Sequence, residues 1–127
     1  MKRLVNCGPV VGILAALVLV GCQPAPPAGP APNQVQVCID WGVGMKITRA
    51  FVTITGRPTV LQVTREIAPV ATEVTDTGEE WVVGIAARMA DVDAGTLWSY
   101  ELNNEAPTTA PNLRHVKPGD VIFWRMR

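Results

Sequence analysis

The chain has 127 residues, with eleven basic and eleven acidic side chains, so its formal net charge is zero at pH 7. That balance, together with the lack of a basic stripe, argues against nucleic acid as a partner. One histidine and three cysteines include no pair at the spacing of a metal site, so we expect no resident metal or cofactor. After an N-terminal segment of different composition, the rest of the chain is long enough for one domain.

Residues 1–21 are organised as a secretory signal peptide. Lys2 and Arg3 give a charged start, an apolar run follows, and small residues precede its end. The run is too short to remain as a membrane-spanning helix. Its removal leaves nine basic against eleven acidic residues in the mature chain.

This segment closes on Leu19, Val20, Gly21 and Cys22, which together resemble a bacterial lipobox. The resemblance implies cleavage before Cys22, a diacylglyceryl thioether on its sulfur and acylation of the new amino group, for example by palmitate. Each buried methylene contributes about 0.8 kcal/mol, so two or three acyl chains hold a protein stably on a membrane. We therefore expect a lipoprotein anchored in the bacterial cell envelope, facing the periplasm or the exterior. The alternative is an ordinary signal peptide with a chance cysteine at its end.

Residues 22–33 combine this predicted anchor with a proline-rich linker. Five prolines stand among alanines and a glycine: Pro24, Pro26, Pro27, Pro30 and Pro32. Such a segment supplies neither an apolar face nor a full set of backbone donors. Extended at about 3.1 Å per residue, it can lift a domain up to roughly 30 Å from the lipid surface.

Residues 34–127 are predicted to form one α+β domain, which begins with a hairpin and a helix. Gln34–Asp40 and Ile47–Thr55 are rich in β-branched residues and are bounded by glycine-bearing turns, which predicts the hairpin. Thr59 then has the chemistry of an N-cap, and apolar residues recur at helical spacing up to Pro69. These signals predict one helix of about two to three turns.

Further strands are expected in the second half of the domain. They are Val70–Thr75, Trp81–Met89, Leu97–Asn103 and Val121–Met126. Together with the hairpin, they predict a small mixed sheet of about four to six strands with one short helix.

Cys38 lies within the first predicted strand. It has no disulfide partner once Cys7 leaves with the signal peptide and Cys22 carries lipid. Because free cysteine is among the most buried residue types, we expect Cys38 to be a small buried strand residue. A reactive or intermolecular thiol is the alternative.

The last third of the domain carries a family resemblance. Residues 97–104 (Leu-Trp-Ser-Tyr-Glu-Leu-Asn-Asn) and 116–124 (Val-Lys-Pro-Gly-Asp-Val-Ile-Phe-Trp) are similar to the ending of the transcobalamin C-terminal-like β-grasp domains. In that family, a strand of the form Trp-x-Tyr-x-x-Asn-Gly leads to a Lys-x-Gly-Asp turn and a last strand with an aromatic residue. Pro58–Leu61 resembles the family's helix start, and Trp81–Ala86 resembles one of its strands. Asn104 replaces the expected glycine, and asparagine tolerates a positive φ better than most residues.

The resemblance implies a β-grasp domain that caps one side of a corrinoid through apolar and aromatic contacts. Trp98 and Tyr100 share one face of their strand, and Trp124 shares a face with Ile122. We therefore predict Trp98, Tyr100 and Trp124 as ligand-binding residues, with a corrinoid-like compound as the first choice of ligand. The alternative is that these aromatic side chains form the core of a small domain.

The sequence offers no constellation for catalysis. Asp120 follows Pro118 and Gly119 in a predicted tight turn, where its role is structural. Ser99 lies inside a strand without a nucleophile-elbow pattern, and His115 lies in a predicted loop. We therefore expect a protein that is not an enzyme, with no catalytic and no metal-binding residues.

Two functions of different classes remain open. The first is a lipid-anchored module that binds a small ligand through an aromatic sheet face. The second is an interaction domain that docks another envelope protein, for instance by edge-strand pairing. A concave, exposed aromatic patch would favour the first, whereas a flat apolar patch or a bare edge strand would favour the second.

Overall fold

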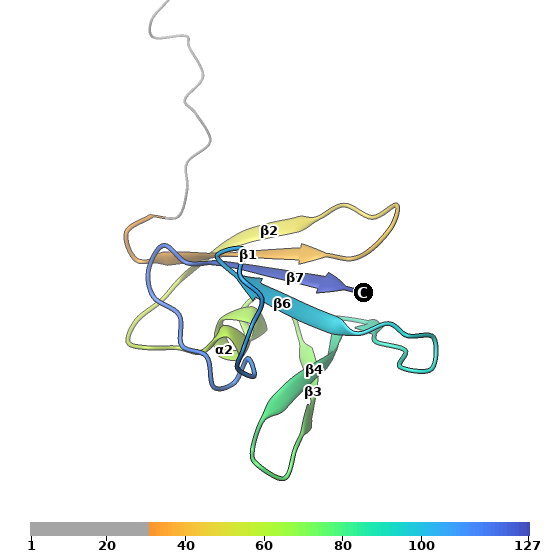
Figure 1. Cartoon of the computed structure of the whole chain (residues 1–127). Helices are drawn as coiled ribbons and strands as arrows, with labels where there is room; N and C mark the ends of the chain where they lie inside the picture. Colours follow the sequence, from red (N-terminus) through yellow and green to blue (C-terminus); the bar gives the residue numbers. More distant parts are fainter. Residues whose placement is uncertain (1–30) are drawn as a thin grey trace, which may run out of the picture.

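The computed structural model describes residues 31–127 (Figure 1). The predicted signal peptide, Cys22 and most of the linker lie outside these described residues. Within them, seven strands and one short helix form an α+β domain, as predicted. No helix in this part of the chain is long and apolar enough to cross a membrane.

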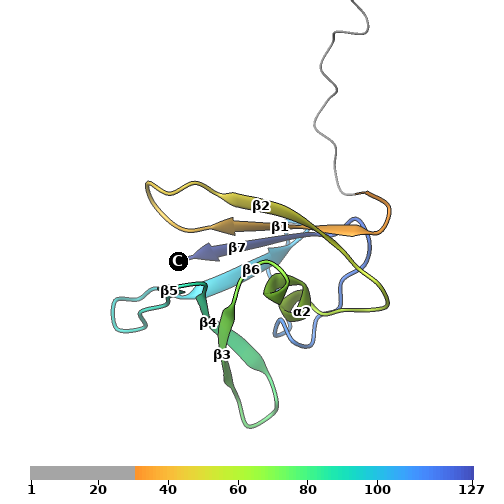
Figure 2. The same cartoon turned by 180° about the vertical axis from the view of Figure 1, so that it is seen from behind.

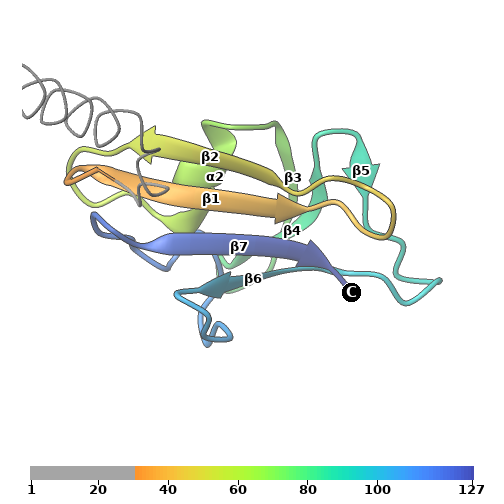
Figure 3. The same ribbon diagram turned by 90° about the horizontal axis from the view of Figure 1, so that it is seen from above.

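Four strands form the larger sheet, and they lie side by side in Figure 3. In spatial order they are β2 (Thr48–Thr53), β1 (Gln34–Asp40), β7 (Val121–Met126) and β6 (Trp98–Leu102). β1 and β7 are parallel, whereas β2 and β6 each run antiparallel to their neighbour. The sheet therefore has a linker end, where β1 and β7 begin, and a distal end, where both strands finish.

The helix α2 (Val60–Arg65) begins as the sequence predicts but is shorter. Thr59 and Gln62 form a capping box, in which each side chain accepts a hydrogen bond from the other residue's backbone N–H, at 3.2 and 2.9 Å. After Arg65, the backbone N–H groups of Ile67 and Ala68 both donate to the Thr64 carbonyl. This tight turn replaces the last helical turn that the sequence predicts. Valine and threonine have modest helix propensity, so they do little to extend the helix toward Pro69.

The remaining strands form a second, three-stranded sheet in the order β3 (Val70–Val74), β4 (Glu80–Ile85) and β5 (Arg88–Met89). The single strand expected over Trp81–Met89 is broken in two, because Ala86 has a positive φ of 52° and turns the chain back on itself. The hairpin of β3 and β4 extends away from the larger sheet (Figures 1 and 2).

The core lies between the inner face of the larger sheet, the helix and β4. Its buried side chains are Val35, Val37, Ile39, Ile54, Val60, Leu61, Val63, Val82, Ile85, Trp98, Tyr100, Leu102, Val116, Ile122 and Trp124. All of them fall between residues 35 and 124, so the hydrophobic core is formed entirely within residues 31–127. A segment of this size with such a core is expected to fold without the preceding residues.

The turn before β7 has the structural role predicted for Asp120. One carboxylate oxygen of Asp120 accepts a hydrogen bond from the Lys117 backbone N–H, and the other accepts one from Asn103 Nδ2, both at 2.9 Å. Gly119 adopts a φ of 91°, which glycine allows at no steric cost. Asn104 takes a φ of 66° where the family pattern has glycine.

Candidate functional site

The structure places Trp98, Tyr100 and Trp124 in the core. Their exposed fractions are 6 %, 3 % and 1 %, and the rings of Tyr100 and Trp124 lie 5.3 Å apart. Each side chain donates a hydrogen bond inside the domain: Trp98 Nε1 to the Arg88 carbonyl, Tyr100 Oη to the Thr109 carbonyl and Trp124 Nε1 to Thr64 Oγ1. The inner face is covered by α2 and β4, so these rings have no free surface on which a flat ligand can stack.

Cys38 is buried, as expected for a strand residue, with 4 % of its surface exposed. It belongs to the outer face of the sheet, where its register partners are Arg49 on β2 and Phe123 on β7. Burial raises the pKa of the Cys38 thiol, and the Arg49 charge offsets part of that rise. The thiol therefore has little thiolate character at neutral pH, which disfavours the reactive alternative.

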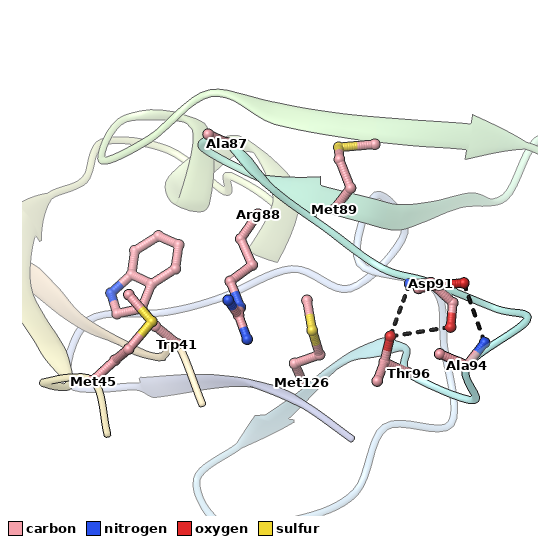
Figure 4. A pocket seen from close by; sticks show the side chains of 9 residues that line it. All are labelled: Trp41, Met45, Ala87, Arg88, Met89, Asp91, Ala94, Thr96 and Met126. Carbon is pink, nitrogen blue, oxygen red and sulfur yellow. Dashed lines mark hydrogen bonds between the residues drawn. The ribbon is translucent and has the colours of Figure 1, made fainter. Parts of the chain in front are cut away.

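A shallow, open depression is found instead at the distal end of the sheet (Figure 4). This distal pocket has a volume of about 750 Å³. Its lining residues come from the β1–β2 loop, the β4–β5 turn, strand β5, the β5–β6 loop and the end of β7: Trp41, Met45, Ala87, Arg88, Met89, Asp91, Ala94, Thr96 and Met126. Parallel β1 and β7 bring these separate segments together.

Methionine dominates the apolar lining of the distal pocket. Apart from Met1, every methionine of the chain lies there: Met45, Met89 and Met126. Met45 and Met89 are each about half exposed, at 50 % and 55 %. Thioether side chains are polarisable and adapt their shape, so they suit an apolar or aromatic ligand of irregular outline.

Trp41 gives the pocket its aromatic side. Its ring lies edge-on to the core residue Trp98, with ring centroids 5.9 Å apart and planes at 87°. Its Nε1 donates a hydrogen bond to Thr48 Oγ1 at 2.7 Å. A ring held at two points is preorganised, and Trp41 remains partly exposed.

Polar groups of the pocket come from Arg88 and the β5–β6 loop. The Arg88 guanidinium lies against Gly42, where a side-chain Cβ would come within 3.2 Å of Arg88 Nη2. Neither of the two ion pairs found among residues 31–127 uses Arg88. Asp91 Oδ1 accepts a hydrogen bond from the Ala94 backbone N–H, and Thr96 Oγ1 accepts one from the Asp91 N–H, so the loop is internally braced.

Within residues 31–127, no group of three or more His, Cys, Asp or Glu side chains is placed to hold a metal ion. The distal pocket is lined instead by thioether side chains, which are polarisable and suit apolar or aromatic groups.

Sequence reasoning missed this pocket because its lining joins strand ends and loops that are remote in sequence. Met89 and Met126 fell within predicted strands, but no local pattern places them beside Trp41. One available signal was the segment from Trp41 to Ile47, where apolar residues alternate with glycines in a loop. In the structure, Val43 and Met45 of that loop are exposed.

A mixed four-stranded sheet over one helix, with a small second sheet and a hollow at one end, defines a β-grasp-like domain. Residues 58–127 match the model of the family described as Domain of unknown function (DUF4430), and the chain belongs to that family. The resemblance to transcobalamin C-terminal-like domains is thereby confirmed at the level of family and fold.

Two solved structures share the fold. A candidate metal binding protein from Ruminococcus gnavus matches with a TM-score of 0.65 and 14 % identity, over 75 % of this chain and 96 % of that one. Haptocorrin in complex with Cbi matches with a TM-score of 0.64 and 15 % identity, over 74 % of this chain and 24 % of that one. The matched region thus spans about a quarter of haptocorrin. No curated protein sequence matches the chain.

Proposed function

We propose that this domain binds a small, largely apolar ligand in the distal pocket, with a corrinoid-like ring compound as the first candidate. The observation that carries the proposal is the meeting of Met45, Met89 and Met126 with the partly exposed Trp41 around one hollow. A volume of about 750 Å³ falls within the range of roughly 300–1,000 Å³ typical of small-molecule sites. Arg88 adds a single positive group that can orient a polar substituent of the ligand.

The structural relatives support binding rather than catalysis. Haptocorrin is described in complex with Cbi, and the Ruminococcus gnavus protein as a candidate metal binder. Because the matched region is about a quarter of haptocorrin, we infer that the present domain covers one side of its ligand. A partner, or a second domain, would cover the other side.

We further propose that the protein acts at the bacterial envelope, held by lipid on Cys22. The predicted linker enters the domain at the start of β1, and the distal pocket lies at the opposite end of the sheet. Six residues of β7 at about 3.3 Å each separate the two ends by roughly 20 Å. The pocket would therefore face away from the membrane, toward a diffusing ligand.

The test is a titration of residues 31–127 with cobinamide, followed by calorimetry and by tryptophan fluorescence corrected for absorbance. We expect saturable binding that weakens by about tenfold in a Met45→Ser/Met89→Ser variant, because about two apolar contacts are lost. Val74→Ser, on the exposed hairpin, is the matched control and should leave the affinity unchanged. Absence of binding up to millimolar cobinamide, an affinity of only about 4 kcal/mol, would refute the proposed ligand class.

The second candidate function, docking of another envelope protein, is favoured by a separate observation. Val43, Val92 and Leu97 lie on the two loops that help line the distal pocket, and they are strongly exposed, at 105 %, 69 % and 55 %. Exposed apolar surface is a feature of interaction sites. A photo-crosslinker at Val43 should then capture one defined envelope protein in cells, whereas the same group at Val74 should not. Equal labelling from both positions would argue against docking.

A further inference from the structure

A second hollow lies at the linker end of the sheet and has a basic lining. Its volume is about 550 Å³, and it is bounded by the loop after β2, the end of β6 and the loop before β7. Its basic side chains are Arg57, Arg114, His115 and Lys117, all of them exposed. The two loops thus contribute three of the nine Arg and Lys residues that follow the predicted signal peptide.

Backbone hydrogen bonds fix the two loops against each other. The Val116 N–H donates to the Pro58 carbonyl at 2.9 Å, and the Val60 N–H donates to the Arg114 carbonyl at 2.8 Å. His115 Nδ1 lies 2.8 Å from the Arg57 carbonyl oxygen. The basic side chains therefore project from a rigid frame, which lowers the entropy lost when they gather around an anion.

The charge of this basic hollow is largely uncompensated. The only carboxylate among its lining residues is that of Asp120, which is 5 % exposed and already accepts hydrogen bonds from the Lys117 backbone and Asn103. Glu105 lies with Arg114 beside a neighbouring, smaller hollow. Neither ion pair detected in the described part of the chain involves Arg57, Arg114 or Lys117.

We propose that the basic hollow binds a phosphate group, carried either by a free anion or by an anionic phospholipid headgroup. Arginine forms paired hydrogen bonds with phosphate oxygens, and lysine adds a point charge. The site is independent of the distal pocket, since the two lie at opposite ends of the sheet. The Gly119 N–H donates to the Gln34 carbonyl at 2.9 Å, so the hollow adjoins the point where the linker enters. For a lipid-anchored chain, this is the end nearest the membrane.

The first arm of the test titrates residues 31–127 with inorganic phosphate, and amide chemical shifts are followed by NMR. We expect saturable shifts centred on Lys117 and its neighbours, and binding about tenfold weaker in Arg57→Gln/Arg114→Gln, because charge-assisted hydrogen bonds are lost. The matched control is Lys46→Gln/Arg49→Gln, which removes the same charge from other parts of the surface. If the Arg57→Gln/Arg114→Gln variant has a lower Tm than the wild type, Lys117→Gln is used in its place. It removes one positive charge from the basic hollow and should also weaken phosphate binding.

The second arm measures co-sedimentation with phosphatidylglycerol-containing vesicles and with pure phosphatidylcholine vesicles at about 0.1 M salt. Saturable phosphate binding without vesicle preference supports a free anion as the ligand. Preference for the anionic vesicles that is lost in the Arg57/Arg114 variant supports a headgroup. Binding in neither arm, or an equal loss in the control variant, would overturn the proposal. Neither result depends on cobinamide, so the outcome is separate from that of the proposed function.

Discussion

The buried hydrogen bond between Trp124 and Thr64 predicts a large cost for a very small change. Trp124 Nε1 donates to Thr64 Oγ1 at 2.8 Å, and the same hydroxyl donates to the Val60 carbonyl at 2.8 Å. Thr64 and Trp124 are 0 % and 1 % exposed, so no water replaces a lost partner. Thr64→Val keeps the side-chain shape but leaves the indole N–H without an acceptor, which costs about 1–3 kcal/mol. For a domain of this size, each kcal/mol lowers Tm by roughly 4–8 °C.

The assay is urea and thermal unfolding of residues 31–127, arranged as a double-mutant cycle. In a Trp124→Phe background the N–H is already gone, so Thr64→Val should then cost much less, with a coupling free energy of about 0.5–3 kcal/mol. Thr108→Val, at an exposed loop position, is the matched control and should change stability by no more than about 0.5 kcal/mol. An equal cost of Thr64→Val in both backgrounds would refute the reasoning.

Three further predictions concern the cysteines and the distal pocket. Because burial raises its pKa, the Cys38 thiol should react slowly with a thiol reagent in the folded protein and quickly after denaturation; equal rates would contradict its buried position. Cys22→Ala should leave an unprocessed precursor without lipid, and unchanged detergent partitioning would remove the lipoprotein hypothesis. In Gly84→Ala, the new Cβ would overlap Met89 Sδ and displace that flexible side chain. Cobinamide affinity should fall about tenfold, because Met89 leaves its place in the pocket wall. Tm should fall little, because only the flexible end of the Met89 side chain has to move. An unchanged affinity would exclude Met89 from the site.

Most strands, the helix start and the last turn of this domain could be predicted from the sequence, because they depend on local chemistry. Alternation of apolar residues with period two identified β1, β6 and β7, because neighbouring side chains of a strand point to opposite faces. Thr59 marked the helix start through its capping hydrogen bond, and Asp120 marked the last turn through its own carboxylate. These features depend on residues only a few positions apart, so they are readable without knowledge of the rest of the chain.

Only the tertiary structure decided which surfaces remain free. Trp98 and Trp124 were readable as aromatic residues on particular strand faces, but their burial depends on α2 and β4 packing over those faces. The break at Ala86 depends on a positive φ that alanine does not favour in isolation, and it is this break that brings Arg88 and Met89 to the distal pocket.

The two hollows also could not be predicted from the sequence, because each is formed by segments that are far apart in the chain. The distal pocket gathers Trp41, Met89 and Met126, and the basic hollow gathers Arg57 with Arg114, from segments that are remote in sequence. The parallel pairing of β1 with β7 places their loops at common ends of the sheet. Strand pairing over such separations is fixed by the packing of the whole core, whereas sequence patterns report only the neighbourhood of each residue.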